Sequence, residues 1–283
     1  MKRVPITSRE YKVMLDANKF ADLEEAVMDF WVDLCFFAHG NSRDATRSAP
    51  LHLKKERDIV YLDSPERELA RHYGYILRRR QTSGEKQAEY TLKLRDSDRY
   101  VSAGGHIHPD DKVLKKTKFE EDLILLPSNL GRSLVQHSRF SHSGVAQVRS
   151  KRKTPENVSD AARLFPGLKE LPWSEKKRKR IPLCVVNDFH PHEWVFGGAE
   201  LVFGEKKKES VHAEVAVILW TDGSAGKPLA AEFSFRYQHK REQYPAVAAE
   251  MAKDFFEALP QLSAWVKPTS PTKTAIAYGA VAD

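Results

Sequence analysis

Three stretches of the chain carry pairs of charged residues two positions apart, the spacing that puts side chains on one face of a strand. The pairs are Glu10 and Lys12, Arg78 and Arg80, and Lys93 and Arg95. Glu214 and Glu232 stand on the charged faces of two later stretches. Arg forks bind phosphate oxygens bidentately and Lys acts as a point charge. Carboxylates supply the hard oxygen ligands that magnesium and manganese prefer.

For any single strand, a charged face is the ordinary solvated side of an antiparallel sheet. The set is more informative, because basic residues gather in some strands and acidic residues in others. If these faces pointed into a closed sheet, the interior would be costly to desolvate without partners. A phosphate chain with bound metal ions would supply those partners. The charged strands therefore predict a cavity that binds a polyphosphate anion with Mg²⁺ or Mn²⁺.

The elements that would position these residues are mostly short strands. Strands follow strands without regular βαβ alternation, which favours an antiparallel barrel or an α+β sheet over a doubly wound parallel sheet. Peripheral helices are predicted at 23–37 and 246–259 from their apolar spacing. The expected strands lie at 4–15, 59–62, 75–80, 90–95, 123–126, 145–151, 183–186, 194–196, 199–203, 211–220 and 230–237.

We expect one domain over residues 1–265, with an insertion around 154–180. The tail at 266–283 is rich in Pro, Thr and Ser and is expected to be poorly ordered.

Composition excludes some classes of protein. Of the 283 residues 41% are hydrophobic, enough for a sizeable core, and the net charge of +7 is weaker than a DNA-binding domain usually shows. Cys35 and Cys184 are too few for a disulfide framework or a zinc site. The Walker GxxxxGK[ST] loop, the GxGxxG turn and the GxSxG elbow are absent. We expect a cytoplasmic protein with a small-molecule ligand; nucleic acid and membrane are not expected as partners, and the oligomeric state is left open.

Two histidine-rich stretches, 106–111 and 190–193, have residue types that bind metals. Pro109 and Pro191 place both stretches in loops, where histidines are usually solvated. The basic run at 176–180 is typical of a solvated loop more often than of a nucleic-acid patch. None of the three is therefore expected to carry the function.

The sequence YLDSPERELARHYGYILRRR at 61–80, followed by EYTLKLR at 89–95, resembles the CYTH domain of the triphosphate tunnel metalloenzymes. That family shows an Asp-Thr-Pro-like step, then Gly-x-x-Leu-Arg-x-Arg and Thr-Leu-Lys-x-Arg. KFEED at 118–122 and AEFSF at 231–235 are also similar to its acidic strands. The resemblance implies an eight-stranded tunnel, a triphosphate-bearing substrate and a requirement for magnesium or manganese.

The resemblance also implies a role for each matching residue. Lys12 would contact phosphate or restrain the attacking water, and in-line hydrolysis would use a metal-activated water. In the stretch 118–122, Glu120 and Asp122 lie on one face and are the pair expected to bind metal. Glu121, on the other face, is the competing candidate. The metal ligands would be Glu10, Glu120, Asp122, Glu214 and Glu232, and the phosphate-binding residues Arg78, Arg80, Lys93 and Arg95, with added charge from Arg149 or Lys151.

Two departures from the family pattern keep the function open. Ser8 stands where the first carboxylate of Glu-x-Glu-x-Lys is expected, and Ser234 replaces a carboxylate of a late Glu-x-Glu. Each loss removes an oxygen ligand for metal. The first hypothesis is a hydrolase of inorganic triphosphate, thiamine triphosphate or a nucleoside triphosphate. The alternatives are a tunnel that binds polyphosphate without cleaving it or serves as an interaction scaffold, an adenylate cyclase of the same fold and, more weakly, RNA binding.

Overall fold

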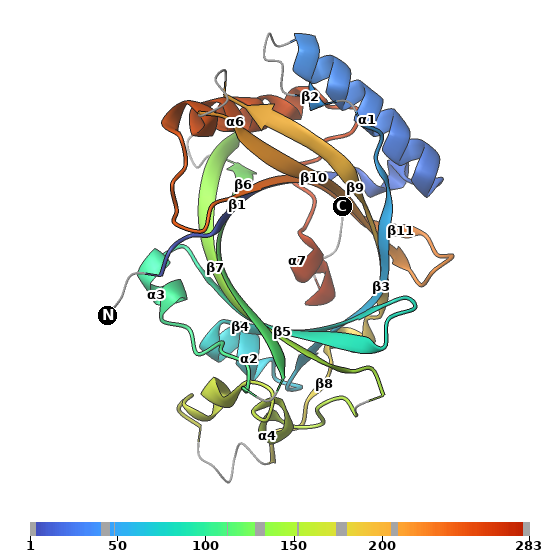
Figure 1. The fold of residues 1–283 in the computed structure, drawn as a ribbon. Helices are drawn as coiled ribbons and strands as arrows, with labels where there is room; N and C mark the ends of the chain where they lie inside the picture. The colour runs from blue at the N-terminus through green and yellow to red at the C-terminus, as the bar shows by residue number, and fades with distance from the viewer. Residues whose placement is uncertain are drawn as a thin grey trace.

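The computed structural model describes residues 4–40, 46–47, 49–111, 113–127, 134–151, 153–173, 180–204 and 209–279. Within these ranges, nine strands hydrogen-bond into a closed ring, which Figure 1 shows in end view. Their order is β9-β10-β11-β1-β6-β7-β5-β4-β3, and β3 pairs with β9 to close the ring. Every neighbouring pair is antiparallel except β1 and β6, which run parallel. The predicted α+β tunnel is confirmed, with nine strands in the ring where eight were expected.

The strands of the ring are β1 (Ser8–Leu15), β3 (His52–Asp63), β4 (Tyr75–Thr82), β5 (Gln87–Asp96), β6 (Leu114–Pro127), β7 (Leu134–Arg149), β9 (Pro191–Phe203), β10 (Val211–Asp222) and β11 (Pro228–Gln238). Two short strands pair onto it, β2 (Thr46–Arg47) with β9 and β8 (Cys184–Val185) with β3. The α-helices are α1 (Leu23–Gly40), α2 (Glu68–Tyr73), α3 (Arg99–Ala103), α4 (Val158–Ala161), α6 (Ala246–Ala258) and α7 (Lys273–Ala277). In the part of the chain that the structure describes, the 3-10 helices are η1 (Ala17–Lys19), η2 (Pro166–Lys169), η3 (Val186–Asp188) and η4 (Leu259–Gln261).

Ring closure depends on β3, which is longer than its sequence suggests. Residues 52–58, HLKKERD, lack apolar alternation and were not predicted as strand, yet they pair with β9. The two strands predicted at 194–196 and 199–203 form one continuous strand, β9. Gly198 has φ 113°, and a Cβ there would lie 2.4 Å from the His52 ring. Glycine therefore permits the bend where β9 passes between β10 and β3.

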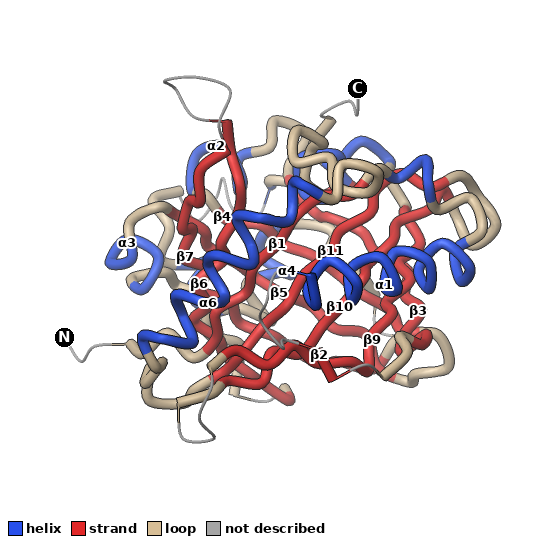
Figure 2. Tube along the Cα trace, turned by 90° about the horizontal axis from the view of Figure 1, so that it is seen from above, coloured by secondary structure: helices blue, strands red, loops and turns tan. Residues whose placement is uncertain are grey.

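The outer face of the ring carries the main core. Helices α1 and α6, both close to their predicted bounds, lie across the same side of the strands (Figure 2). Tyr11 and Phe235 are buried in the cluster that includes Phe30 of α1 and Phe256 of α6. Because side chains alternate along a strand, residues adjacent to these apolar positions point into the ring.

A second cluster covers the outside of β4, β5 and β7. It joins Leu77 and Leu92 of the ring to Val158, Phe165 and Leu168, from the segment expected as an insertion. The segment thus packs against the strands that carry the predicted phosphate-binding residues. The KKRKR run of 176–180 lies outside the described residues except for its last member.

The C-terminal segment was expected to be poorly ordered, and over residues 266–279 this expectation is wrong. Val266 bridges to Leu15, and α7 lies within the opening of the ring (Figure 1). Among the described residues, no helix is long and apolar enough to span a membrane.

Candidate functional site

The ring encloses a cavity of about 1070 Å³. Among the described residues, thirteen Lys or Arg and six Asp or Glu line it. Ten of the twelve predicted site residues are in this lining. Arg149 and Lys151 are not, because they lie exposed at the end of β7 and in the turn beyond it. The ten are Glu10, Lys12, Arg78, Arg80, Lys93, Arg95, Glu120, Asp122, Glu214 and Glu232.

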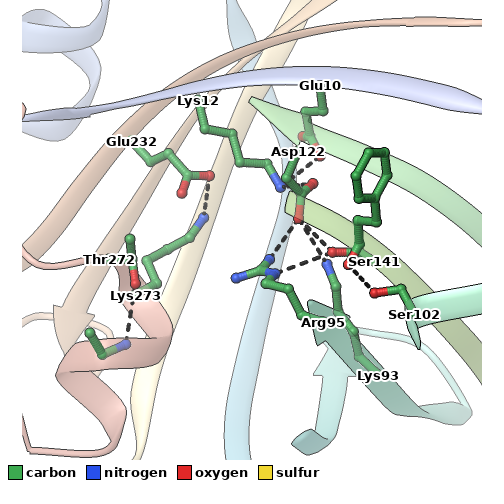
Figure 3. Close-up of polar contacts among 12 residues, drawn as sticks. Glu10, Lys12, Lys93, Arg95, Ser102, Asp122, Ser141, Glu232, Thr272 and Lys273 are labelled. Carbon is green, nitrogen blue, oxygen red and sulfur yellow. Dashed lines mark hydrogen bonds and ion pairs between the residues drawn. The ribbon is translucent and has the colours of Figure 1, made fainter. Parts of the chain in front are cut away.

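Asp122 of β6 is the centre of one charged cluster (Figure 3). Its Oδ1 accepts a hydrogen bond from Lys12 Nζ at 2.8 Å, and its Oδ2 accepts from Arg95 Nη2 at 2.8 Å and Ser141 Oγ at 2.7 Å. Lys93 Nζ lies 3.4 Å from the same Oδ2. Burial raises the pKa of this carboxyl, but the charges of Lys12, Lys93 and Arg95 hold it well below its usual range. Asp122 is therefore a buried anion shared by three cations.

Lys12 joins this cluster to β1. Its ammonium also lies 2.9 Å from Glu10, which is in register with Asp122 across the parallel β1–β6 pair. Burial lowers the pKa of Lys12, but Asp122 and Glu10 raise it overall. Lys93 behaves in the opposite way: burial, followed by the charge of Arg95, lowers its pKa to about 8. The two cations on β5, Lys93 and Arg95, thus share the single carboxylate of Asp122, which also binds Lys12.

A second cluster, formed by Arg57, Arg78 and Arg80, lines the cavity on β3 and β4. Glu193 of β9, fully buried, accepts a hydrogen bond from Arg57 Nη1 at 2.9 Å and lies 3.7 Å from Arg80 Nε. Its other oxygen accepts from Trp220 Nε1 at 3.0 Å. Burial raises the pKa of Glu193, yet the charges of Arg80, Lys273 and Arg57 lower it overall. Glu193 and, more weakly, Glu89 of β5, 3.8 Å from Arg80 Nη1, are the carboxylates that face the arginine cluster.

Among the described residues, Arg78 is the member of that cluster for which no carboxylate lies within ion-pair distance. Its Nε is buried and has no hydrogen-bond acceptor there, as is also true of Arg80 Nε and, on the opposite face of β4, of Arg79 Nε. Burial and then the charge of Arg80 lower the pKa of Arg78. The pKa of Arg57 is lowered for the same two reasons, in the same order. Three guanidinium groups thus share two carboxylates, Glu193 and Glu89, and the positive charge of the cluster is not fully balanced.

Sequence reasoning missed Arg57 and Glu193. Arg57 lies in the polar stretch 52–58, which has no strand signal. Glu193 was grouped with His190 and His192 as a loop, but Pro191 is the first residue of β9, so His192 and Glu193 lie in a strand. Trp220, Glu193's second partner, is on the neighbouring strand at the paired position, a relation visible only in the register.

The five carboxylates expected to hold metal line the cavity, but they are paired with cations and are not grouped as a metal site. Among the residues that the structure describes, no group of three His, Cys, Asp or Glu side chains is placed to hold a metal. Ser234, in place of a carboxylate, pairs with Lys12 across β1 and β11. Each carboxylate instead has a side-chain cation: Glu10 has Lys12, Glu120 has Lys118, Asp122 has Lys12, Lys93 and Arg95, Glu214 has Arg236, and Glu232 has Lys273.

No protein-family profile matches the chain, and no curated protein matches its sequence. Solved structures with a similar arrangement include a protein of Hippeastrum, assigned as an adenylyl cyclase and described as having a dominant triphosphatase activity. It is 11% identical over 95% of this chain and 94% of that one, with a TM-score of 0.39. A protein of Bacillus halodurans assigned as an adenylate cyclase is 11% identical over 96% of both chains, with a TM-score of 0.37.

A third structure, of a Pyrococcus horikoshii protein, is 12% identical over 92% of this chain and 95% of that one, with a TM-score of 0.29. Similarity at this level carries no argument about activity. The closed ring of strands has the tunnel architecture that the resemblance to the CYTH domain implies. The case for a function therefore rests on the residues of the cavity.

Proposed function

We propose that the cavity binds a polyphosphate-bearing small molecule through the cations of β3, β4 and β5. The observation that carries this proposal is Arg78, which lines the cavity beside Arg57 and Arg80 with its buried Nε unsatisfied, while the carboxylates Glu193 and Glu89 pair with the other two arginines. A phosphate group offers several oxygens to such forks and brings the negative charge that the cluster lacks.

The two charged clusters line one cavity, so a chain of phosphates has room to contact both. Arg78 is opposite Thr91 on β5, and Lys93 is two residues further along that strand. Such diagonal neighbours lie about 7–8 Å apart, within reach of long side chains that bind one ligand. A triphosphate group would thus run from the arginine cluster toward Lys93, Arg95 and Lys12.

Metal-dependent hydrolysis of inorganic triphosphate, thiamine triphosphate or a nucleoside triphosphate is the second candidate. It is favoured by Glu10, Glu120 and Asp122, which lie close together on the paired strands β1 and β6 and line the cavity. Each of them is paired with a cation, however, so no cleavage step follows from this arrangement. Cyclase activity, scaffold and RNA-binding roles and a cytoplasmic location stay predictions of the sequence.

The test compares two adjacent arginines. Arg78 lines the cavity, whereas Arg79, the next residue on β4, is on the opposite face and outside the lining. Calorimetric titration with inorganic triphosphate should show a loss of about 10-fold to 100-fold in affinity for Arg78→Ala, the range of one charge-assisted hydrogen bond. Arg79→Ala should bind within about twofold of wild type. Equal losses in the two variants would show that the cavity does not hold the phosphates.

Phosphate release separates binding from cleavage. The purified protein is incubated with inorganic triphosphate, ATP or thiamine triphosphate, with Mg²⁺ or Mn²⁺ and with EDTA. Metal-dependent release from one of them would establish the hydrolase and begin to define its substrate. Binding without release under all these conditions would identify a tunnel that holds polyphosphate without cleaving it.

A further inference from the structure

The C-terminal segment enters the cavity and is fixed there at both ends. Residues 268–275 line the cavity without a break. Before them, Val266 bridges to Leu15 of β1. After them, Asn187 Nδ2 donates a hydrogen bond to the Ala277 carbonyl at 3.0 Å. This segment is therefore part of the cavity wall and not a tail outside it.

The end of α7 is also anchored by a half-buried side chain, that of Tyr278. Tyr278 donates its hydroxyl to Asp63 Oδ2 at 3.3 Å, and its ring packs edge-on against Tyr61 of β3. Burial raises the pKa of Tyr278, and the charge of Asp63 raises it further, so the hydroxyl keeps its proton. These contacts fix the position of Lys273, five residues earlier on the same short helix.

Lys273 is the charged residue that this segment brings into the cavity. Its Nζ lies 2.9 Å from Glu232 Oε1, on the side of the cavity across from the Asp122 cluster (Figure 3). The side chains of Lys273 and Glu232 are only 13% and 9% exposed. An ammonium has three N–H donors, and Glu232 accepts from one. Among the described residues no second acceptor bonds Lys273, and two donors remain for a ligand in the cavity.

A divalent ion and a lysine ammonium can play the same electrostatic role beside a carboxylate. Each neutralises the carboxylate, and each also attracts an anion, such as a phosphate, that approaches from the cavity. Glu232 is one of the five carboxylates expected to hold metal, and the Lys273 ammonium lies 2.9 Å from its Oε1. Asp122 and Glu10 are neutralised in the same manner by Lys12, Lys93 and Arg95.

We propose that Lys273 is a further ligand-binding residue, a tethered cation that neutralises Glu232 in place of a divalent ion and donates to the bound polyphosphate. Binding then needs no divalent metal. This inference rests on the proposed function of the cavity. It assigns to the C-terminal segment a direct part in recognising the ligand.

The test measures the affinity of the full chain for inorganic triphosphate in EDTA and in excess Mg²⁺. The wild type should bind in EDTA. Lys273→Gln should lose about tenfold or more in EDTA, and Mg²⁺ should restore part of this loss because Glu232 becomes free to hold it. Lys273→Arg keeps the charge and should bind in EDTA. As a matched control, Lys253→Gln removes a lysine of α6 that is 53% exposed and should have no effect.

Several outcomes would overturn the inference. One is that Lys273→Gln binds triphosphate in EDTA as well as the wild type does. Another is that it binds more tightly, which would mean that Lys273 blocks the site. A wild type that binds only with Mg²⁺ would also overturn it, while leaving the proposed function intact. A wild type that binds in neither condition would contradict the proposed function itself. Thermal unfolding of each variant confirms that it is folded.

Discussion

Asp122→Asn tests whether one buried carboxylate holds the cavity's cations together. Asp122 is 2% exposed and is shared by Lys12, Lys93 and Arg95. Removing one partner of a buried ion pair costs about 3–5 kcal/mol. The three cations are 18–29% exposed, so water in the cavity screens them and the low end applies. The free energy of unfolding should fall by about 3 kcal/mol.

Thermal unfolding should show this loss as a fall in Tm of about 6–12 °C. The range follows from a shift of about 2–4 °C for each kcal/mol, the value for chains somewhat shorter than this one. Inorganic triphosphate in EDTA should stabilise the variant more than the wild type, because a negative charge that repels the ligand is gone. For scale, ligand at 100 times its Kd adds about 2.7 kcal/mol.

The matched control is Asp188→Asn, in which the lost carboxylate is 96% exposed. It should change stability by no more than about 0.5 kcal/mol. If Asp122→Asn also stays within that range, the cations do not depend on Asp122 and the reasoning is refuted. If the variant is destabilised but triphosphate stabilises it less than the wild type, then Asp122 assists ligand binding by holding the cations in place.

Two further predictions concern pH and backbone packing. Burial, followed by the charge of Arg95, lowers the pKa of Lys93 to about 8. Lys93 is charged below that pH and neutral above it. The affinity for triphosphate should therefore fall as the pH rises from about 7 to about 9. The charges of Asp122, Lys12 and Glu120 also affect the pKa of Lys93. In the Lys93→Arg variant the side chain stays charged, so calorimetry should show an affinity that changes less with pH. A pH dependence identical to that of the wild type would contradict the assignment. Gly144→Ala should lower the free energy of unfolding by about 1–3 kcal/mol in a urea titration, because its Cβ would lie 1.8 Å from the Ile107 carbonyl oxygen. Gly104→Ala, whose nearest atoms are at 3.5 Å, is the control, and an equal loss there would argue against the clash.

The strand alternation was the most reliable signal in the sequence. Tyr11 and Phe235 pack against the outer helices, and this forces Lys12 and Ser234, their neighbours in the chain, toward the cavity. Alternation is local, because successive side chains on any strand point to opposite faces. The same rule placed Arg78 with Arg80 and Lys93 with Arg95 on the inner face. Arg149, assigned through the resemblance, is in phase with Val145 and Gln147 of the lining but lies exposed at the end of β7.

Residues 52–58 show what local pattern could not reveal. Their strand conformation is fixed by pairing with β9, far along the chain, and not by apolar residues of their own. Ring closure and the position of Arg57 both follow from that pairing. A sequence-based strand prediction depends on periodic hydrophobicity, which a polar strand inside a closed ring does not need to show.

The sequence by itself determined the class of fold, the outer helices and the inner face of most strands, because hydrophobic periodicity and side-chain alternation act over a few residues. Only the tertiary structure decided which charges meet. Glu193 meets Arg57 across 136 positions, and Lys273 meets Glu232 across 41, with its helix held by Tyr278 against Asp63 across 215. Such pairs depend on ring closure and strand register, and these are set by hydrogen bonds and packing between segments far apart in the chain.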